Sequence, residues 1–230
     1  GSLLAIVCWY PFLPRRERFR FNRVNFWQFA ASGVLAALSS CVPSPINNRT
    51  GGNWIIIGRL TPVMTSSPDA AKALVATGST LSRRLLSHPF PVVAVCTGHA
   101  IAKGAFLLLS SDYRLGVAGP FKIGLNETAI GMTMHHAGIE IARHRLAPAH
   151  FYRSVVNAEI YNPEGAVEAG FLDEVVAQDK LVERATELAQ HFKTLNMRAH
   201  RETKLKAKAD YLALLDRCIE QDAEHLGLNG

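Results

Sequence analysis

The sequence predicts an α/β fold in which short buried strands alternate with helices. Residues 91–98, "PVVAVCTG", form a β-branched apolar run ending in glycine, which is typical of a buried strand. Residues 67–88 begin with a serine, a proline and an acid and then carry apolar residues at helical spacing, which predicts a helix. Pro89 and Pro91 end that helix ahead of the strand.

The same alternation predicts the remaining elements. Strands are expected at residues 53–58, 113–117, 120–125 and 172–176. Helices are expected at residues 100–112, 135–146, 148–156, 162–170 and 179–195, and one long amphipathic helix at 198–226 closes the chain. We divide the chain into an atypical N-terminal segment at 1–65, a core at 66–177 and a C-terminal helical region at 178–230.

The N-terminal segment differs from the rest of the chain in its charge. It holds seven arginines against the single acid Glu17 and no lysine, so the whole formal charge of +6 comes from it. Residues 15–29 interleave arginines with aromatic residues, a pattern that fits nucleic acid, anionic lipid or a merely solvated face. No nucleic-acid motif accompanies it, so we expect no nucleic-acid partner.

The composition is that of a globular protein, with 48% hydrophobic and 19% charged residues. The four cysteines lie far apart without metal-ligand spacing, which predicts free thiols and no metal site. No apolar run reaches the roughly 20 residues of a membrane span, and the arginines follow the apolar opening instead of preceding it. We therefore expect a soluble cytoplasmic protein.

Three ordered motifs carry a resemblance to a known family. They are "PVVAVCTGHAIAKGAFLLLSSDYRLG" at 91–116, "FKIGLNETAIGM" at 121–132 and "NPEGAVEAGFLDEVV" at 162–176. Together they resemble the signature of the crotonase, or enoyl-CoA hydratase/isomerase, superfamily over residues 68 to about 225. The resemblance implies a crotonase-like spiral of ββα units with a C-terminal helical region that serves in trimerisation.

The resemblance also implies an oxyanion hole for the enolate of an acyl-CoA thioester. One donor of such a hole is a backbone amide at the head of the buried helix after the Gly-rich turn, which by position is that of Lys103. Unpaired amides and the helix dipole at a helix N-terminus favour an anion in any fold. Since only the amide is used, the Lys103 side chain is expected to point away.

Glutamates flanking the acyl group supply acid–base chemistry in this family. One of these positions is Phe106 here, which cannot transfer a proton, and the other is matched by Glu127. A single shuttling carboxylate can move a proton between two carbons, whereas hydration usually takes two carboxylates. The resemblance with this departure therefore favours enoyl-CoA isomerisation over hydration.

Other residues are expected along the substrate. The resemblance places Gly98, His99, Ala102, Gly104, Phe106, Met134, His135 and His136 beside it. Either His135 or His136 is a candidate second acid or base, with helix capping or packing as the alternative, and His99 is either exposed or in contact with coenzyme A. Lys204, Lys206 and Lys208 either form a solvated face or meet the phosphates of coenzyme A from a neighbouring subunit.

The family motif that supplies the other oxyanion donor is missing from its expected place near residues 53–64. Residues 1–63 are therefore either a divergent segment or the product of a wrong reading frame joined to an ordinary crotonase. The leading function is enoyl-CoA isomerisation, with enoyl-CoA hydration and a catalytically silent acyl-CoA-binding protein as alternatives. No cofactor is expected beyond the coenzyme A of the substrate, and the expected assembly is a homotrimer or hexamer.

Overall fold

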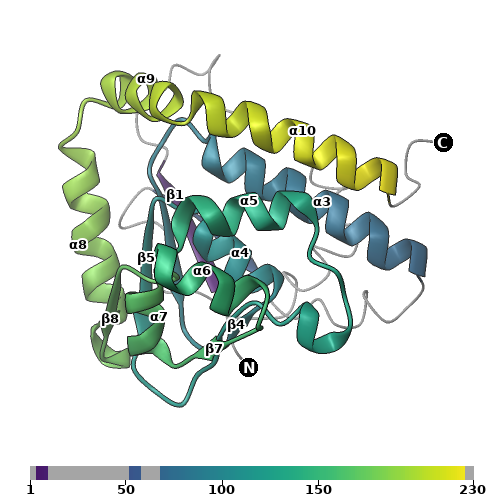
Figure 1. The fold of residues 1–230 in the computed structure, drawn as a ribbon. Helices are drawn as coiled ribbons and strands as arrows, with labels where there is room; N and C mark the ends of the chain where they lie inside the picture. Colours follow the sequence, from purple (N-terminus) through teal and green to yellow (C-terminus); the bar gives the residue numbers. More distant parts are fainter. Residues whose placement is uncertain (1–3, 10–51, 58–67, 226–230) are drawn as a thin grey trace.

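Two sheets form the framework of the fold. The computed structural model describes residues 4–9, 52–57 and 68–225, and within these ranges one sheet has five strands and the other three (Figure 1). The strands are β1 Leu4–Trp9, β2 Gly52–Ile57, β3 Val92–Cys96, β4 Ala100–Ile101, β5 Tyr113–Val117, β6 Ile123–Gly124, β7 Ile160–Tyr161 and β8 Glu174–Val176. The large sheet has the order β2-β1-β3-β5-β8, and the small sheet has the order β4-β6-β7.

Strand β3 lies at the centre of the large sheet. It runs parallel to β5, with Val93 opposite Tyr113, and antiparallel to β1. All five of its residues are buried, which is why its sequence is a continuous apolar run instead of an alternating one. The strand therefore requires a layer of helices on each face.

Helices supply both layers. They are α3 Pro68–Leu86, α4 Lys103–Leu109, α5 His136–Arg145, α6 Pro148–Val155, α7 Pro163–Ala169, α8 Leu181–Lys193, α9 Met197–Ala207 and α10 Ala209–His225, with short 3-10 turns at Thr128–Ile130 and Gln178–Lys180. In Figure 1, α3, α5 and α10 lie together on one side and α8 lies on the other. The odd and even residues of β3 belong to different apolar clusters, one around α4 and one beneath α8.

The sequence predictions agree with this structure for most elements. The expected strand at 53–58 is confirmed, but β1, which pairs with both β2 and β3, was not expected. The helix predicted from residue 100 begins only at Lys103, because Ala100 and Ile101 pair with β6 instead. The strand β7 was also missed.

The predicted long C-terminal helix is broken at Lys208. Its backbone angles, φ −106° and ψ 8°, leave the helical range, so α9 and α10 are separate helices. Hydrogen bonds still cross the break, from the Lys208 amide to Lys204 O at 3.2 Å and from the Leu212 amide to Lys208 O at 2.8 Å. The break falls where the Lys204 and Lys208 side chains both turn inward to one carboxylate, described below.

Arg114 ties β5 to the segment before β8. The arginine is buried, and its guanidinium forms two hydrogen bonds with the carboxylate of Asp173, at 2.8 and 2.5 Å. The same carboxylate accepts the Arg114 backbone amide at 2.8 Å, and the guanidinium also donates to Gly170 O. A planar guanidinium matches this two-point geometry, which lysine could not reproduce.

Helix α10 controls the start of α5 through Asp222. Its buried carboxylate accepts the backbone amides of His136 at 2.7 Å and Ala137 at 2.9 Å. These amides have no intrahelical acceptor, and a negative charge at a helix N-terminus is favourable. The C-terminal helix therefore fixes the position of α5, and with it that of His135.

The Asp222 cap gives a stability prediction. We expect Asp222→Ala to lower the free energy of unfolding by about 1–2 kcal/mol, because two buried amides lose their acceptor. Asp216→Ala on the same helix removes a half-exposed pair with Arg83 and is expected to cost less than about 1 kcal/mol. Urea unfolding followed by circular dichroism measures both, and equal losses would contradict the capping role.

Candidate functional site

The turn before α4 is held in a conformation that alanine rarely adopts. Ala102 has φ 52° and ψ −116°, and its amide donates to Gly124 O at 3.0 Å. Phe106 is the first residue of α4 whose amide donates back, to Ala102 O at 3.1 Å. The amides of Lys103, Gly104 and Ala105 therefore precede the first intrahelical bond, and such amides can bind an anion.

At Gly104 there is room for a side-chain Cβ, so steric crowding does not require a glycine there. A Cβ there would lie 3.7 Å from that of Ala100, an ordinary contact. Gly98 is buried just after β3, where its carbonyl accepts the Cys96 thiol at 3.1 Å. Gly98 and Gly104, which are both expected beside the substrate, thus also belong to the packed structure of the turn.

Phe106 fills the place where a second carboxylate would stand in the family pattern. The side chain is 1% exposed, and its ring packs edge-on to His135 with centroids 5.3 Å apart. Gly138 makes this packing possible, because a Cβ there would lie 2.9 Å from Phe106 Cζ and 2.7 Å from His135 Cε1. This position is an apolar part of the core.

Glu127 is a buried carboxyl just before the Thr128–Ile130 turn. It is 7% exposed, and its Oε2 has no hydrogen-bond partner within the described residues. Burial raises the pKa of Glu127, and hydrogen bonds from the backbone of Glu127 and Asn126, followed by the charge of Lys103, work against that rise. A buried carboxyl with an available oxygen and a raised pKa has the properties of a general acid or base.

His135 and His136 are adjacent in the sequence but lie in different environments. His135 is half-buried beside Phe106, and burial together with the Lys103 charge lowers its pKa to about 4, against a smaller opposing effect of Asp222. Its imidazole is therefore neutral near pH 7. His136 is exposed and lies near the ring of His225. Met134 before them is buried.

His99 faces solvent at the edge of the turn. Its Nδ1 accepts the Lys122 amide at 2.9 Å, and its ring meets Phe121 edge-on at 5.7 Å. The imidazole thus joins the turn to the strand β6. Contact of His99 with coenzyme A stays a prediction.

The Lys103 side chain extends to helix α3. It is half-buried, and its Nζ donates to Ser82 Oγ at 2.7 Å. It also interacts electrostatically with both Glu127 and His135. The sequence analysis did not identify Ser82 as the partner of Lys103, nor the space that Gly78 leaves for the lysine side chain. The sequence signal for this contact was a glycine inside the amphipathic helix at 67–88.

Two of the three lysines that were expected either to form a solvated face or to meet coenzyme A instead form ion pairs inside the protein. Lys204 and Lys208 both form ion pairs with Asp112, which also accepts the Val92 amide at 2.9 Å. Burial alone would raise the pKa of Asp112, but the two ammonium groups outweigh it and hold the pKa below its usual value. Lys206 is exposed, and its contact with coenzyme A stays a prediction.

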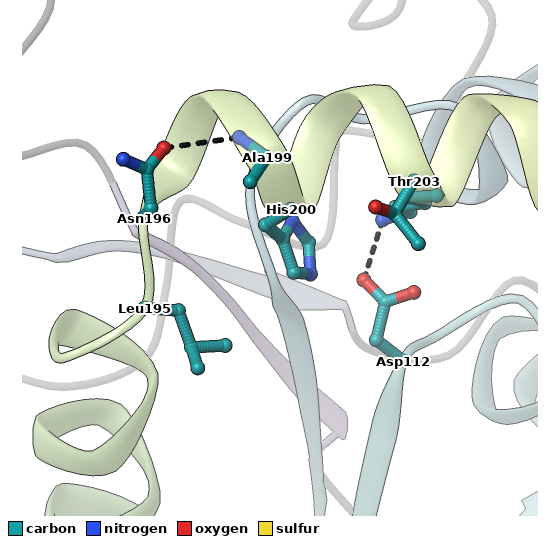
Figure 2. Close-up of a pocket in the computed structure, with 7 residues that line it drawn as sticks. Asp112, Leu195, Asn196, Ala199, His200 and Thr203 are labelled. Carbon is teal, nitrogen blue, oxygen red and sulfur yellow. Dashed lines mark hydrogen bonds and ion pairs between the residues drawn. The ribbon is translucent and has the colours of Figure 1, made fainter.

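A cavity of about 400 Å³ opens beside the Asp112 ion pairs, at the opposite end of α4 from Glu127. Figure 2 shows Asp112 and His200 at its wall, with the Asn196 side chain accepting the Ala199 amide at 3.0 Å at the start of α9. It is lined by Asp112, Leu195, Asn196, Ala199, His200, Thr203 and Lys204. Neither Glu127 nor His135 is among the residues that line the cavity.

Among the described residues there is neither a candidate metal site nor a candidate membrane span. In residues 4–9, 52–57 and 68–225, no three His, Cys, Asp or Glu side chains are placed to hold a metal ion. None of the helices in these ranges has the length and apolar character that a membrane span requires.

Comparisons with known proteins confirm the expected crotonase fold. A structure of an enoyl-CoA hydratase/isomerase family protein from Pseudomonas syringae is 61% identical, with TM-score 0.70 and 72% of each chain covered. An enoyl-CoA isomerase from Mycobacterium tuberculosis is 40% identical, with TM-score 0.66 and 71% of each chain covered. Crotonyl-CoA hydratase from Syntrophomonas wolfei is 23% identical over 158 residues.

The match to the enoyl-CoA hydratase/isomerase family model spans residues 60–227. The chain therefore belongs to the enoyl-CoA hydratase/isomerase family. The aligned region is 69% of this chain and 60% of the Syntrophomonas wolfei hydratase. The first 59 residues lie outside the family match.

The backbone of Ala102 gives a second stability prediction. Strain at a left-handed, glycine-favoured conformation costs about 1–3 kcal/mol, more than the entropy that glycine adds to the unfolded chain. We therefore expect Ala102→Gly to raise the free energy of unfolding by about 1 kcal/mol. Ala105→Gly, inside α4, should lower it by at least about as much, and a loss of stability in both variants would contradict the strain.

The Asp112 ion pairs give a third prediction. We expect Lys204→Met to lower the free energy of unfolding by about 3 kcal/mol, since it leaves a largely buried carboxylate with one partner. Lys206→Met, on the exposed face of the same helix, should stay within about 0.5 kcal/mol. Chemical unfolding measures both, and a neutral Lys204→Met would show that the pair is not a structural link.

Proposed function

We propose that this protein isomerises enoyl-CoA thioesters, with Glu127 as the only carboxylate that moves the proton. The observation that carries the proposal is that Glu127 is a buried carboxyl while the other expected acid–base position, Phe106, holds a buried phenyl ring. Removal of a proton at C2 gives an enolate, and return of that proton at C4 completes the shift of the double bond. One carboxylate within reach of both carbons is sufficient for these two steps.

The enolate oxygen would lie at the head of α4. The amides of Lys103, Gly104 and Ala105 precede the first intrahelical hydrogen bond. The Lys103 amide would be the oxyanion donor. Fixed donors aimed at developing charge lower a barrier by about 3 kcal/mol each. The relative from Mycobacterium tuberculosis is described as an enoyl-CoA isomerase in one structure and as a probable enoyl-CoA hydratase in another, so it fits either reaction.

Hydration of 2-enoyl-CoA is the second candidate, favoured by the likeness to crotonyl-CoA hydratase. It needs one group to activate water and another to protonate carbon. With Phe106 in place of a carboxylate, the neutral imidazole of His135 would have to take one of these roles. Isomerisation makes no such demand, so it is the function that the site supports best.

The proposed substrate carries coenzyme A as part of the thioester, and no further cofactor enters the reaction. We also propose that the protein assembles as a homotrimer through its C-terminal helical region, following the family resemblance. Light scattering coupled to size-exclusion chromatography measures the mass of the assembly. A monomer at micromolar concentration would contradict the trimer.

The activity prediction compares two substrates and two variants. We expect purified protein to convert 3-enoyl-CoA to 2-enoyl-CoA faster than it hydrates 2-enoyl-CoA. Glu127→Gln should lower kcat for isomerisation by about 10²–10⁴-fold, the usual contribution of a general acid–base group. Glu164→Gln, an exposed acid in the first turn of α7, is the matched control and should leave kcat unchanged.

Other outcomes of the same assay have direct meanings. A faster hydration of 2-enoyl-CoA would replace isomerisation by hydration as the function. Tight acyl-CoA binding by calorimetry without turnover of either substrate would instead indicate a catalytically silent binding protein. Full activity of Glu127→Gln would remove Glu127 from the mechanism.

A further inference from the structure

Large apolar side chains gather on one exposed face of the protein. Among the described residues six large apolar side chains are exposed, and four of them, Ile130, Tyr152, Val156 and Ile160, belong to neighbouring segments around the end of α6. Their exposed fractions lie between 36% and 67%. Single exposed apolar residues are normal, whereas a group of them marks a surface that binds another molecule. We call these four residues the α6 patch.

Hydrogen bonds join the helical part of the α6 patch to the turn that carries Ile130. Tyr152 and Val156 are four residues apart along α6 and its C-terminal cap, so they lie on the same side of the helix. The Val156 amide donates to Tyr152 O at 3.0 Å, and the Thr128 hydroxyl donates to Val156 O at 3.1 Å. Thr128 begins the 3-10 turn that ends at Ile130, so this turn is tied to the end of α6.

A short turn after α6 leads to Ile160. Ala158 in this turn has φ 52°, and the Glu159 amide donates to Arg153 O at 2.9 Å. Ile160 then pairs with Gly124 of β6, where a Cβ at residue 124 would lie only 2.9 Å from Ile160 Cδ1. These contacts hold the backbone beneath the α6 patch in place, and an ordered surface loses less entropy on binding than a flexible one.

An ion pair adjoins the α6 patch. Arg153 follows Tyr152 on α6 and Glu159 precedes Ile160, and the Arg153 guanidinium donates two hydrogen bonds of 2.6 Å to the Glu159 carboxylate. Both side chains are partly exposed, so the patch has one accessible charge of each sign beside it. Such a surface is complementary to a copy of itself turned by 180°, because each arginine can then face the glutamate of the other copy.

We propose that the α6 patch is an interface between two copies of this chain related by a two-fold axis, with Tyr152 and Val156 at its centre. A two-fold contact uses the same surface on both copies, whereas a cyclic trimer uses two different surfaces at each contact. The patch would therefore join two of the trimers proposed above into a hexamer. It would join two monomers if the C-terminal helices formed no trimer, so its test depends neither on the trimer nor on any activity.

Val156→Glu tests the interface by placing an unpaired charge at its centre. We expect the mass of the assembly, measured by light scattering coupled to size-exclusion chromatography at micromolar concentration, to fall to half that of the unchanged protein. Val182→Glu on α8 is the matched control, because Val182 is 51% exposed against 54% for Val156 but lies outside the α6 patch, and it should leave the mass unchanged. Equal masses of the unchanged protein and Val156→Glu would overturn the proposal.

Charge reversal at the ion pair tests whether the partner is a second copy. Arg153→Glu gives every copy two acids beside the patch, and Glu159→Arg gives every copy two arginines, so like charges meet and each variant alone should have half the mass of the unchanged protein. In an equimolar mixture an acidic surface meets a basic one at each two-fold contact, and we expect the full mass to return. A mixture that keeps the halved mass would overturn the two-fold arrangement.

A membrane surface is the other occupant that exposed apolar residues beside an arginine could meet. Sedimentation with vesicles of phosphatidylglycerol measures this binding for the unchanged protein and for Val156→Glu. We expect neither protein to sediment with the vesicles, because the patch of the unchanged protein is already covered by the second copy. Sedimentation of the unchanged protein that is lost in Val156→Glu would assign the α6 patch to a lipid surface and overturn the proposal.

Discussion

The hydrogen bond from the Ala102 amide to the Gly124 carbonyl, 3.0 Å long, is the constraint on which the site depends. It joins the start of α4 to the strand that leads into Glu127, and it holds Ala102 in a conformation that ends the strand β4 and begins the helix. The amides at the head of α4 and the Glu127 carboxyl are thereby fixed relative to each other. A reaction that separates charge between an oxygen and a carboxylate needs this fixed relation.

Other contacts of the fold stabilise the elements around the α4 amides and the Glu127 carboxyl. Asp112 gathers Lys204, Lys208 and the Val92 amide at the far end of α4, and Arg114 binds Asp173 across the strands β5 and β8. Asp222 on α10 fixes the start of α5. Asp112, Arg114 and the C-terminal helices thus stabilise the surroundings of the site without forming part of it.

The strand-and-helix order and the turn before α4 followed from the sequence because they depend on local signals. Proline, glycine and β-branched runs mark "PVVAVCTG", and the resemblance in three ordered motifs identified Glu127 and Phe106. The inward course of Lys103 did not follow, because it depends on Gly78 and Ser82 of a helix distant from it in sequence. The break at Lys208 was missed for the same reason, since a helical period cannot show that Lys204 and Lys208 share the distant Asp112.

In the proposed reaction, the Glu127 carboxylate takes the proton from C2 of the substrate and returns it at C4. Transfer of deuterium from C2 of labelled 3-enoyl-CoA, measured by mass spectrometry of the 2-enoyl-CoA product in ordinary water, tests this most directly. A single shuttling Glu127 predicts that part of the label appears at C4 in early turnover. Product that carries no label at C4 from the first turnover onwards would contradict the direct return of the proton by Glu127.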